Sequence, residues 1–169
     1  AELSPDGRSL ALGTRDGWLE VLGPDGAERF TVQVYDGSDV VVDGVNYGAV
    51  AQDIDEVTWS GDGRWVAGVS HRTGHRKVCR VATGACLDER HEPQEVMVNF
   101  TGDGAGFITR RVGRAVPQHG LRRTELPAGD ESWSTMSGLF RSSIQGIAIG
   151  RERVVVTDAV GELGVFTSE

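Results

Sequence analysis

The stretch at residues 57–69 reads VTWSGDGRWVAGV, and this order of side chains predicts two β-strands joined by a tight turn. Apolar residues alternate up to Ser60 and resume at Trp65, which is the period of strands that bury one face. Between them lies Asp62-Gly63, a pair that favours chain reversal. Asp hydrogen-bonds its own backbone, and Gly accepts a positive φ without a Cβ clash. We therefore expect a β-hairpin with this pair in its turn.

The same pattern returns along the chain. Residues 3–21 read LSPDGRSLALGTRDGWLEV and residues 98–108 read VNFTGDGAGFI, with Asp-Gly again at each turn. A fourth, weaker unit has apolar runs at 146–150, 154–157 and 163–166 but no Asp-Gly pair. The units recur after roughly 40 to 56 residues, close to the period of about 40 to 50 residues of four-stranded propeller blades.

These residues resemble the WD-repeat β-propeller family. Residues 3–8, LSPDGR, followed by Asp16-Gly17, resemble the first half of the family's repeat, and residues 78–87, VCRVATGACL, resemble its strand and Thr-Gly turn. The Trp-Asp positions of the family are occupied here by Leu22-Gly23, Cys79-Arg80 and Phe166-Thr167. The resemblance implies an all-β fold of about four blade units, each a four-stranded antiparallel sheet, held by apolar packing more than by buried polar ties.

We expect one partial propeller domain over residues 1–169. Its units span about 1–35, 57–90, 96–139 and 145–167, with an insertion at 36–56. The chain begins at what reads as the end of a strand, so we expect the C-terminal part of a larger propeller, with four closed blades as the alternative. An open fragment exposes sheet faces and strand edges, which favours self-association.

Composition and charge narrow the classes of partner. Glycine supplies 24 of 169 residues, about twice its ordinary share, which fits a turn-rich chain. A formal net charge of −8 argues against nucleic-acid and anionic-membrane partners, because both are bound through Lys and Arg. We therefore expect protein partners.

The two cysteines do not form a disulfide framework. If the turn centres on residues 82–83, Cys79 and Cys86 lie opposite each other across a hairpin, close enough to be bridged. The cysteine content favours a reducing, cytoplasmic location, and there we expect both thiols to stay free, with Cys79 as a small buried hydrophobe.

No pattern in the chain carries catalytic chemistry. The four histidines show no recurrent spacing with the cysteines, as zinc sites require. Each Asp-Gly turn offers one or two carboxylates, whereas a calcium loop needs several oxygen ligands, so we expect structural turns. Neither a nucleophile elbow nor a phosphate loop occurs. The sequence predicts no enzyme activity, no metal and no cofactor.

Charge is segregated along the chain, which marks the candidate interaction residues. Residues 30–63 carry seven acids and no Lys or Arg, whereas residues 105–124 carry five Arg and no acid. Solvated loops and attraction between neighbouring blades explain this pattern, and so does a partner-facing surface. Trp18, Trp59 and Trp65 lie in strand patterns and are expected in the core. The candidate interaction residues are Asp39, Asp43, Tyr47, Asp53, Arg110, Arg111, Arg114 and Trp133.

The function that these features favour is a non-catalytic protein-interaction scaffold or sensor segment of a larger multidomain protein. Two alternatives stay open. One is an accessory propeller of an enzyme, such as a hydrolase, whose catalytic domain lies outside this chain. The other is a stand-alone four-bladed ligand binder with a central channel.

Overall fold

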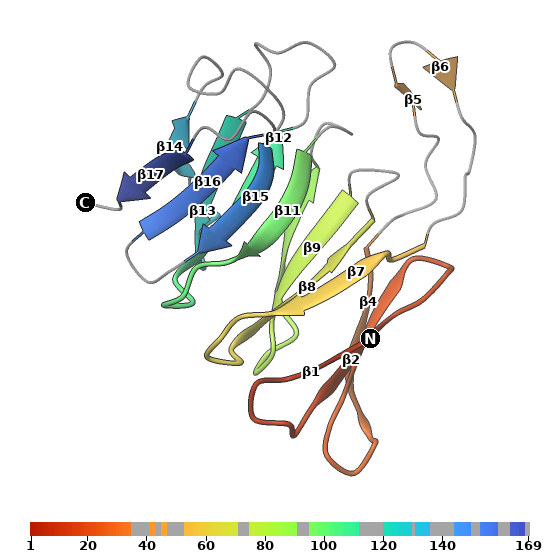
Figure 1. Ribbon diagram of the computed structural model, residues 1–169. Helices are drawn as coiled ribbons and strands as arrows, with labels where there is room; N and C mark the ends of the chain where they lie inside the picture. Colours follow the sequence, from red (N-terminus) through yellow and green to blue (C-terminus); the bar gives the residue numbers. More distant parts are fainter. Residues whose placement is uncertain are drawn as a thin grey trace. The chain divides into compact units, whose positions relative to one another are not determined.

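The computed structural model describes residues 1–34, 41–42, 45–46, 53–70, 75–90, 95–111, 120–129, 131–135, 144–149, 153–158 and 163–167. Every regular element in these ranges is a β-strand (Figure 1). Over the same ranges there is no helix long and apolar enough to cross a membrane. The strands belong to two compact units, Ala1–Pro93 and Gln94–Glu169.

The first unit contains two four-stranded antiparallel sheets. The first sheet joins β1 (Glu2–Leu3), β2 (Leu10–Gly13), β3 (Trp18–Leu22) and β4 (Glu28–Gln33) in chain order. The second sheet joins β7 (Glu56–Trp59), β8 (Trp65–Val69), β9 (His75–Arg80) and β10 (Cys86–Arg90), also in chain order. In the chain, between the strands of these two sheets, β5 (Val41–Val42) and β6 (Val45–Asn46) pair as a short hairpin. Part of the expected insertion is therefore a small extra hairpin.

The second unit repeats this up-and-down order. The third sheet joins β11 (Glu95–Phe100), β12 (Gly106–Arg111), β13 (Gly120–Glu125) and β14 (Glu131–Thr135). The fourth sheet joins β15 (Ile144–Ile149), β16 (Arg153–Asp158) and β17 (Leu163–Thr167). The chain is therefore all-β, with four small antiparallel sheets of three or four strands.

Most strands lie where the apolar alternation predicts them. The hairpin at residues 57–69 is confirmed as β7 and β8, and the three runs of the weak fourth unit are confirmed as β15, β16 and β17. The strand that the sequence marks least clearly is β14 (Glu131–Thr135), near the end of the expected unit 96–139. Its sequence, ESWST, has a single large apolar residue and therefore no alternation to mark its ends.

The two sheets of the first unit pack face to face. The first sheet contributes Ala11, Leu19 and Val21 to a buried apolar cluster, and the second sheet contributes Trp59, Val66 and Cys79. The sheets approach closely at Gly68, where an added Cβ would lie 3.3 Å from the Leu19 Cβ. The Trp59 indole N–H also donates to the Glu2 carbonyl oxygen at 3.1 Å. Apolar packing therefore joins these sheets, with one polar tie at its edge.

Two of the three tryptophans expected in the core are there. Trp59 and Trp65 are 6% and 7% exposed. Trp18 is only half-buried. Its neighbour Leu19 is fully buried, and successive side chains of a strand point to opposite faces, so Trp18 points away from the second sheet.

The second unit has a similar but smaller core. Ile108 and Leu121 of the third sheet pack with Val154 and Val156 of the fourth. Ile147 adds to this cluster from β15. The alternate positions of β15 and β16 therefore form the inner face of the fourth sheet.

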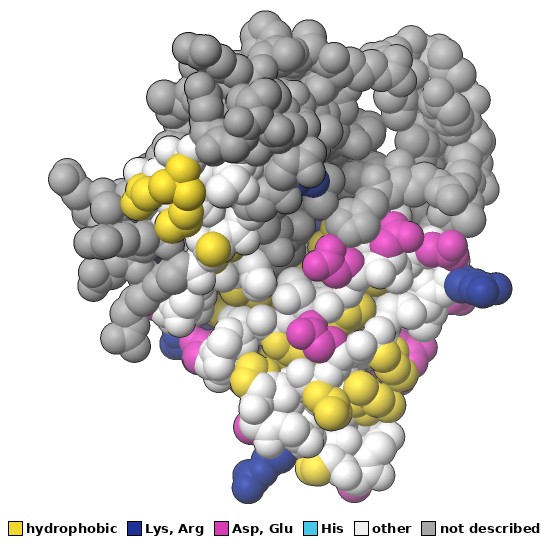
Figure 2. All heavy atoms as spheres, in the orientation of Figure 1, with side chains coloured by type: hydrophobic (Ala, Val, Ile, Leu, Met, Phe, Trp, Pro, Cys, Tyr) yellow, Lys and Arg dark blue, Asp and Glu magenta, His cyan; other side chains and the backbone are white. Residues whose placement is uncertain are grey.

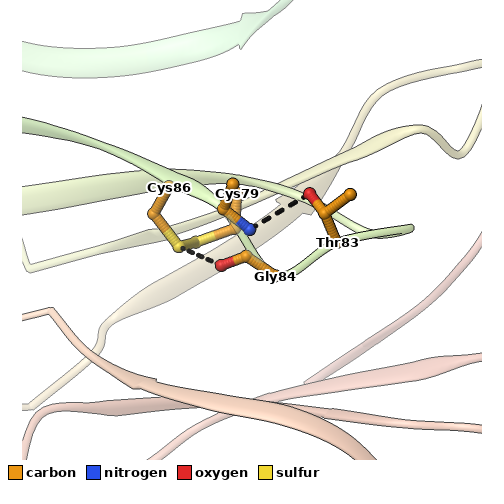
Figure 3. The surroundings of a disulfide bond; sticks show 5 residues. Cys79, Thr83, Gly84 and Cys86 are labelled. Carbon is orange, nitrogen blue, oxygen red and sulfur yellow. Dashed lines mark hydrogen bonds between the residues drawn. A yellow bond between two sulfur atoms is a disulfide. The ribbon is translucent and has the colours of Figure 1, made fainter.

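Cys79 and Cys86 are directly paired in β9 and β10 and form a disulfide (Figure 3). The Arg80 N–H donates to the Ala85 carbonyl oxygen next to them, so the cysteines occupy the closely spaced, non-hydrogen-bonded position. Their Cα atoms are 4.0 Å apart. The expectation of free thiols is wrong, because this register holds both sulfurs on one face of the hairpin. Cys79 is fully buried, as expected.

Replacing both Cys79 and Cys86 with alanine should lower the free energy of unfolding by about 2–3 kcal/mol. The bridge closes a short loop, with a sequence separation of 7, and loop closure of that size restricts the unfolded chain by roughly this amount. Urea denaturation without reductant measures the difference. Dithiothreitol should lower the wild type to the level of the variant, and a wild type that is insensitive to the reductant contradicts the bridge.

Gly13→Ala should destabilise the first unit by about 1–3 kcal/mol, as overpacking does. A Cβ at Gly13 would lie 2.5 Å from the Ile54 Cγ2 and 3.0 Å from the Ile54 carbonyl oxygen, so the backbone must shift. The matched control is Gly61→Ala, where an added Cβ meets nothing within 4 Å. There we expect no loss, because alanine restricts the unfolded chain. Equal loss in both variants, measured by urea denaturation, would contradict close packing at Gly13.

Candidate functional site

The Asp-Gly turn is the repeated local structure from which the candidate site is built. In the first sheet the Ser4 hydroxyl donates to Asp6 Oδ1 at 2.6 Å and accepts from the Ser9 N–H at 2.9 Å. The same Asp6 oxygen accepts from the Arg8 N–H at 3.0 Å. Gly7 completes the reversal with a φ of 69°. One hydroxyl therefore connects the carboxylate to the first residue after the turn.

The second and third sheets use the same arrangement. The Ser60 hydroxyl donates to Asp62 Oδ1 at 2.7 Å and accepts from the Trp65 N–H at 2.9 Å. The Thr101 hydroxyl donates to Asp103 Oδ1 at 2.6 Å and accepts from the Gly106 N–H at 2.9 Å. Gly63 and Gly104 have φ values of 69° and 67°. The expected tight turns are confirmed, and these carboxylates serve to hold them.

Hydrogen bonding shifts the acids of these turns toward the ionised form. The bond from the Ser4 hydroxyl, followed by the Arg8 N–H, lowers the pKa of Asp6, and the bond from the Thr101 hydroxyl lowers the pKa of Asp103. Burial raises the pKa of Asp62, but the bonds from Ser60 and Arg64 outweigh it, so its pKa is also lowered. All three carboxylates are therefore charged at neutral pH.

The turns of the first and second sheets lie side by side. A Cβ at Gly63 would lie 3.8 Å from the Pro5 Cδ. Between the two turns is a cleft of about 300 Å³, which is the candidate functional site. Its lining residues are Ser4, Pro5, Asp6, Ser9, Arg29, Trp59, Gly61, Asp62, Gly63 and Val81.

The cleft combines charged groups with apolar walls. Asp6 and Asp62 supply carboxylates from the two turns, and Arg29 supplies a guanidinium. Arg64 pairs with Asp62, Nε to Oδ2, at 2.5 Å. Pro5, Trp59 and Val81 supply the apolar surface. A cavity of this volume with few polar groups fits a side chain or a small polar ligand.

Among the residues that the structure describes, no histidine lines the cleft. The Ser4 hydroxyl is committed to the turn through Asp6 and Ser9. Of the four histidines, only His75 lies in the part of the chain that the structure describes, and it begins β9, whereas the cleft lies next to Arg80, where β9 ends. In the described ranges there is also no group of three or more His, Cys, Asp or Glu that could hold a metal.

Of the expected interaction residues, those whose side chains the structure describes, Asp53 and Arg110, do not line this cleft. Asp53 belongs to the first unit, immediately before the buried Ile54, and Arg110 belongs to β12 in the second. For Arg111 and Trp133 the structure describes the strand backbone only, in β12 and β14. Asp39, Asp43, Tyr47 and Arg114 lie outside the described residues.

Part of the basic segment is paired within its own strand. Arg123 Nε lies 2.9 Å from Glu125 Oε1 in β13, and the Arg123 side chain is 12% exposed. This pair lies within one strand and is not the attraction between neighbouring blades that was one of the two explanations for the segregated charge, so that explanation also stays a prediction. The partner-facing explanation stays a prediction for the others.

The cleft itself was not predicted from the sequence. The signal that points to it is the recurrence of Asp-Gly at the same place in successive units. When two such sheets pack face to face in register, their turns come side by side. The search for single motifs missed this, because neither turn forms the cleft alone.

Ser60→Ala should lower stability at pH 7 by about 1–3 kcal/mol, since the buried Trp65 N–H loses its hydroxyl acceptor and Asp62 loses a donor. The hydroxyl helps to lower the pKa of Asp62, so this part of its contribution is present above the unfolded value of about 3.8 and is lost as the pH falls through the folded value. The difference from wild type should therefore shrink from pH 7 to pH 2.5.

The matched control is Ser60→Thr, which keeps the hydroxyl that Thr101 provides in the third sheet. It should retain most of the wild-type stability and its pH dependence. Urea denaturation at both pH values makes the comparison. A loss in Ser60→Ala that is equal at pH 7 and pH 2.5 would show that the carboxylate takes no part in the turn.

Comparison with known proteins adds no relative. No protein-family model matches the chain, and no curated protein matches it. Inferences about its function therefore rest on the repeated sheets, on the Asp-Gly turns between the first two strands of three of them, and on the cleft between two of those turns.

Proposed function

We propose that this chain is a non-catalytic protein-binding module assembled from WD-repeat-like propeller blades. The support is the repeat: three four-stranded sheets with strands in chain order, each with an Asp-Gly turn between its first two strands. Repetition of one small sheet with one turn is typical of propeller architectures. Binding by such repeats uses the loops and turns that lie at the ends of the strands.

The observation that carries the binding function is the cleft between the turns of the first and second sheets. Asp6 and Asp62 are held in fixed positions by Ser4 and Ser60, so the walls are preorganised. Trp59 lies in the wall and is fixed by its bond to the Glu2 carbonyl oxygen. Rigid charged and aromatic walls favour recognition of a partner side chain or loop.

The proposed partner is a protein. The net charge of −8 disfavours phosphate-rich partners, and the cleft offers two carboxylates against one lining arginine. A cytoplasmic location was expected from the cysteine content, whereas the Cys79–Cys86 bridge is typical of oxidising compartments.

Gly61→Tyr tests the cleft directly. Gly61 lines the cleft, and an added Cβ there meets nothing within 4 Å, so a tyrosine can be placed at the cleft wall without disturbing the turn. We expect at least a tenfold loss of captured partner, measured by affinity capture on the immobilised full chain with quantitative mass spectrometry. Melting of the variant should match wild type.

Gly102→Tyr is the matched control, because Gly102 is exposed at the same position of the third-sheet turn, outside the cleft. It should capture partners as wild type does. A chain lacking residues 40–50 provides a second arm. If partners are lost on that deletion but are still captured by Gly61→Tyr, the binding surface is the insertion and not the cleft. If the wild type binds no protein partner saturably, the proposed protein-binding function is wrong.

A further inference from the structure

The exposed large apolar side chains of the described residues mark two sheet faces. They are Leu3, Leu163 and Val165, with 61%, 65% and 52% of their surface exposed. Leu3 lies in β1 of the first sheet, and Leu163 and Val165 lie in β17 of the fourth. Figure 2 shows hydrophobic side chains gathered over the first sheet, low in the view, and over the fourth sheet at the upper left.

The first of these faces is the side of the first sheet that points away from the second. Leu3 pairs with Leu10, which pairs with Leu22, so three leucines form one row across β1, β2 and β3. Leu12 and Trp18 share this side, because they alternate with the buried Ala11 and Leu19. We call this surface, with its four leucines, one tryptophan and Glu20, which pairs with Leu12, the leucine face.

The second is the side of the fourth sheet that points away from the third. Ala148 pairs with Val155, which pairs with Val165, and these residues alternate with the inner Val154 and Val156. Leu163 lies on the same side, two residues before Val165. We call this surface the valine face. Its side chains are smaller than those of the leucine face.

Sheets of this chain already pack by placing large side chains against small ones. In the first unit, Leu19 and Val34 of one sheet meet Gly68 of the other, at 3.3 Å from an added Cβ. The leucine face and the valine face have the same relation of size. Both adjoin established sheet-on-sheet interfaces through the opposite sides of their own sheets.

We infer that the leucine face of one copy of this chain binds the valine face of a second copy. The contact is heterologous, because it joins two different surfaces. Each bound copy keeps one face open, so association continues from copy to copy as the concentration rises. The partner on either face is therefore an antiparallel sheet of this same protein.

The area of the leucine face and the valine face limits how strongly two copies can associate. Three strands spaced about 4.8 Å apart and five residues rising about 3.3 Å each give a flat face of roughly 240 Å². Covering one such face on each copy stays below the roughly 1,200 Å² of stable complexes, so we expect a weak association that depends on concentration. Each copy carries a net charge of −8, and salt should therefore strengthen the contact by screening this repulsion.

Two charge-introducing variants test the inference, Leu3→Glu in the leucine face and Val165→Glu in the valine face. Both side chains are more than half exposed, so the inner cores stay intact, which melting and circular dichroism verify. Sedimentation at about 5 to 200 µM measures the mass. We expect wild type to grow beyond a dimer with concentration, more so at 0.5 M than at 0.05 M salt, and each variant alone to stay monomeric.

Mixing the two variants is the decisive arm. Leu3→Glu keeps its valine face and Val165→Glu keeps its leucine face, so an equimolar mixture should form a dimer and stop there. A monomeric wild type, a mixture that stays monomeric, or either variant associating as wild type does would each overturn the inference. A dimer from one variant alone would show a face binding its own kind, which also overturns it.

Discussion

The structure depends on one buried hydroxyl at the Asp-Gly turn between the first two strands of the first, second and third sheets. Ser4, Ser60 and Thr101 are 6%, 0% and 4% exposed, and each joins an aspartate to the backbone on the far side of the turn. This bond fixes which residues of the two strands face each other. A slip of one residue would turn every inner side chain outward, so in these three sheets the turns help to keep the apolar packing in register.

The same constraint connects packing to recognition. Once the first and second sheets meet through Leu19 and Gly68, their turns must lie next to each other, and the gap between Pro5 and Gly63 becomes the edge of the cleft. The carboxylates that stabilise the turns are then also the charges that line it. In the proposed function, structural and recognition roles would therefore fall on the same residues, which agrees with the lack of a separate site motif in the chain.

Sequence reasoning succeeded where the signal is local. The alternation around Ser60 and Trp65 is complete within one hairpin, and the strands predicted from it are present.

Sequence reasoning failed where the outcome depends on residues that are distant in the chain, or where few residues carry the signal. Trp18 and Leu19 are both apolar neighbours, and only the packing of the second sheet decides that Leu19 is the one buried. The thiol state of Cys79 and Cys86 was predicted from an assumed compartment, whereas the register of β9 and β10 brings the sulfurs together. The cleft could not be predicted from one motif, because it forms only where the turns of two sheets lie side by side.

The order of strands has a consequence for how the protein is made. Within each of the four sheets every strand pairs with its neighbour in the chain, and each turn hydroxyl reaches no further than five residues. Contacts this local close small loops, which is the cheapest and fastest kind of pairing for a growing chain. Each sheet can therefore acquire its strands as its own residues leave the ribosome, before the next sheet that will cover it has been synthesised.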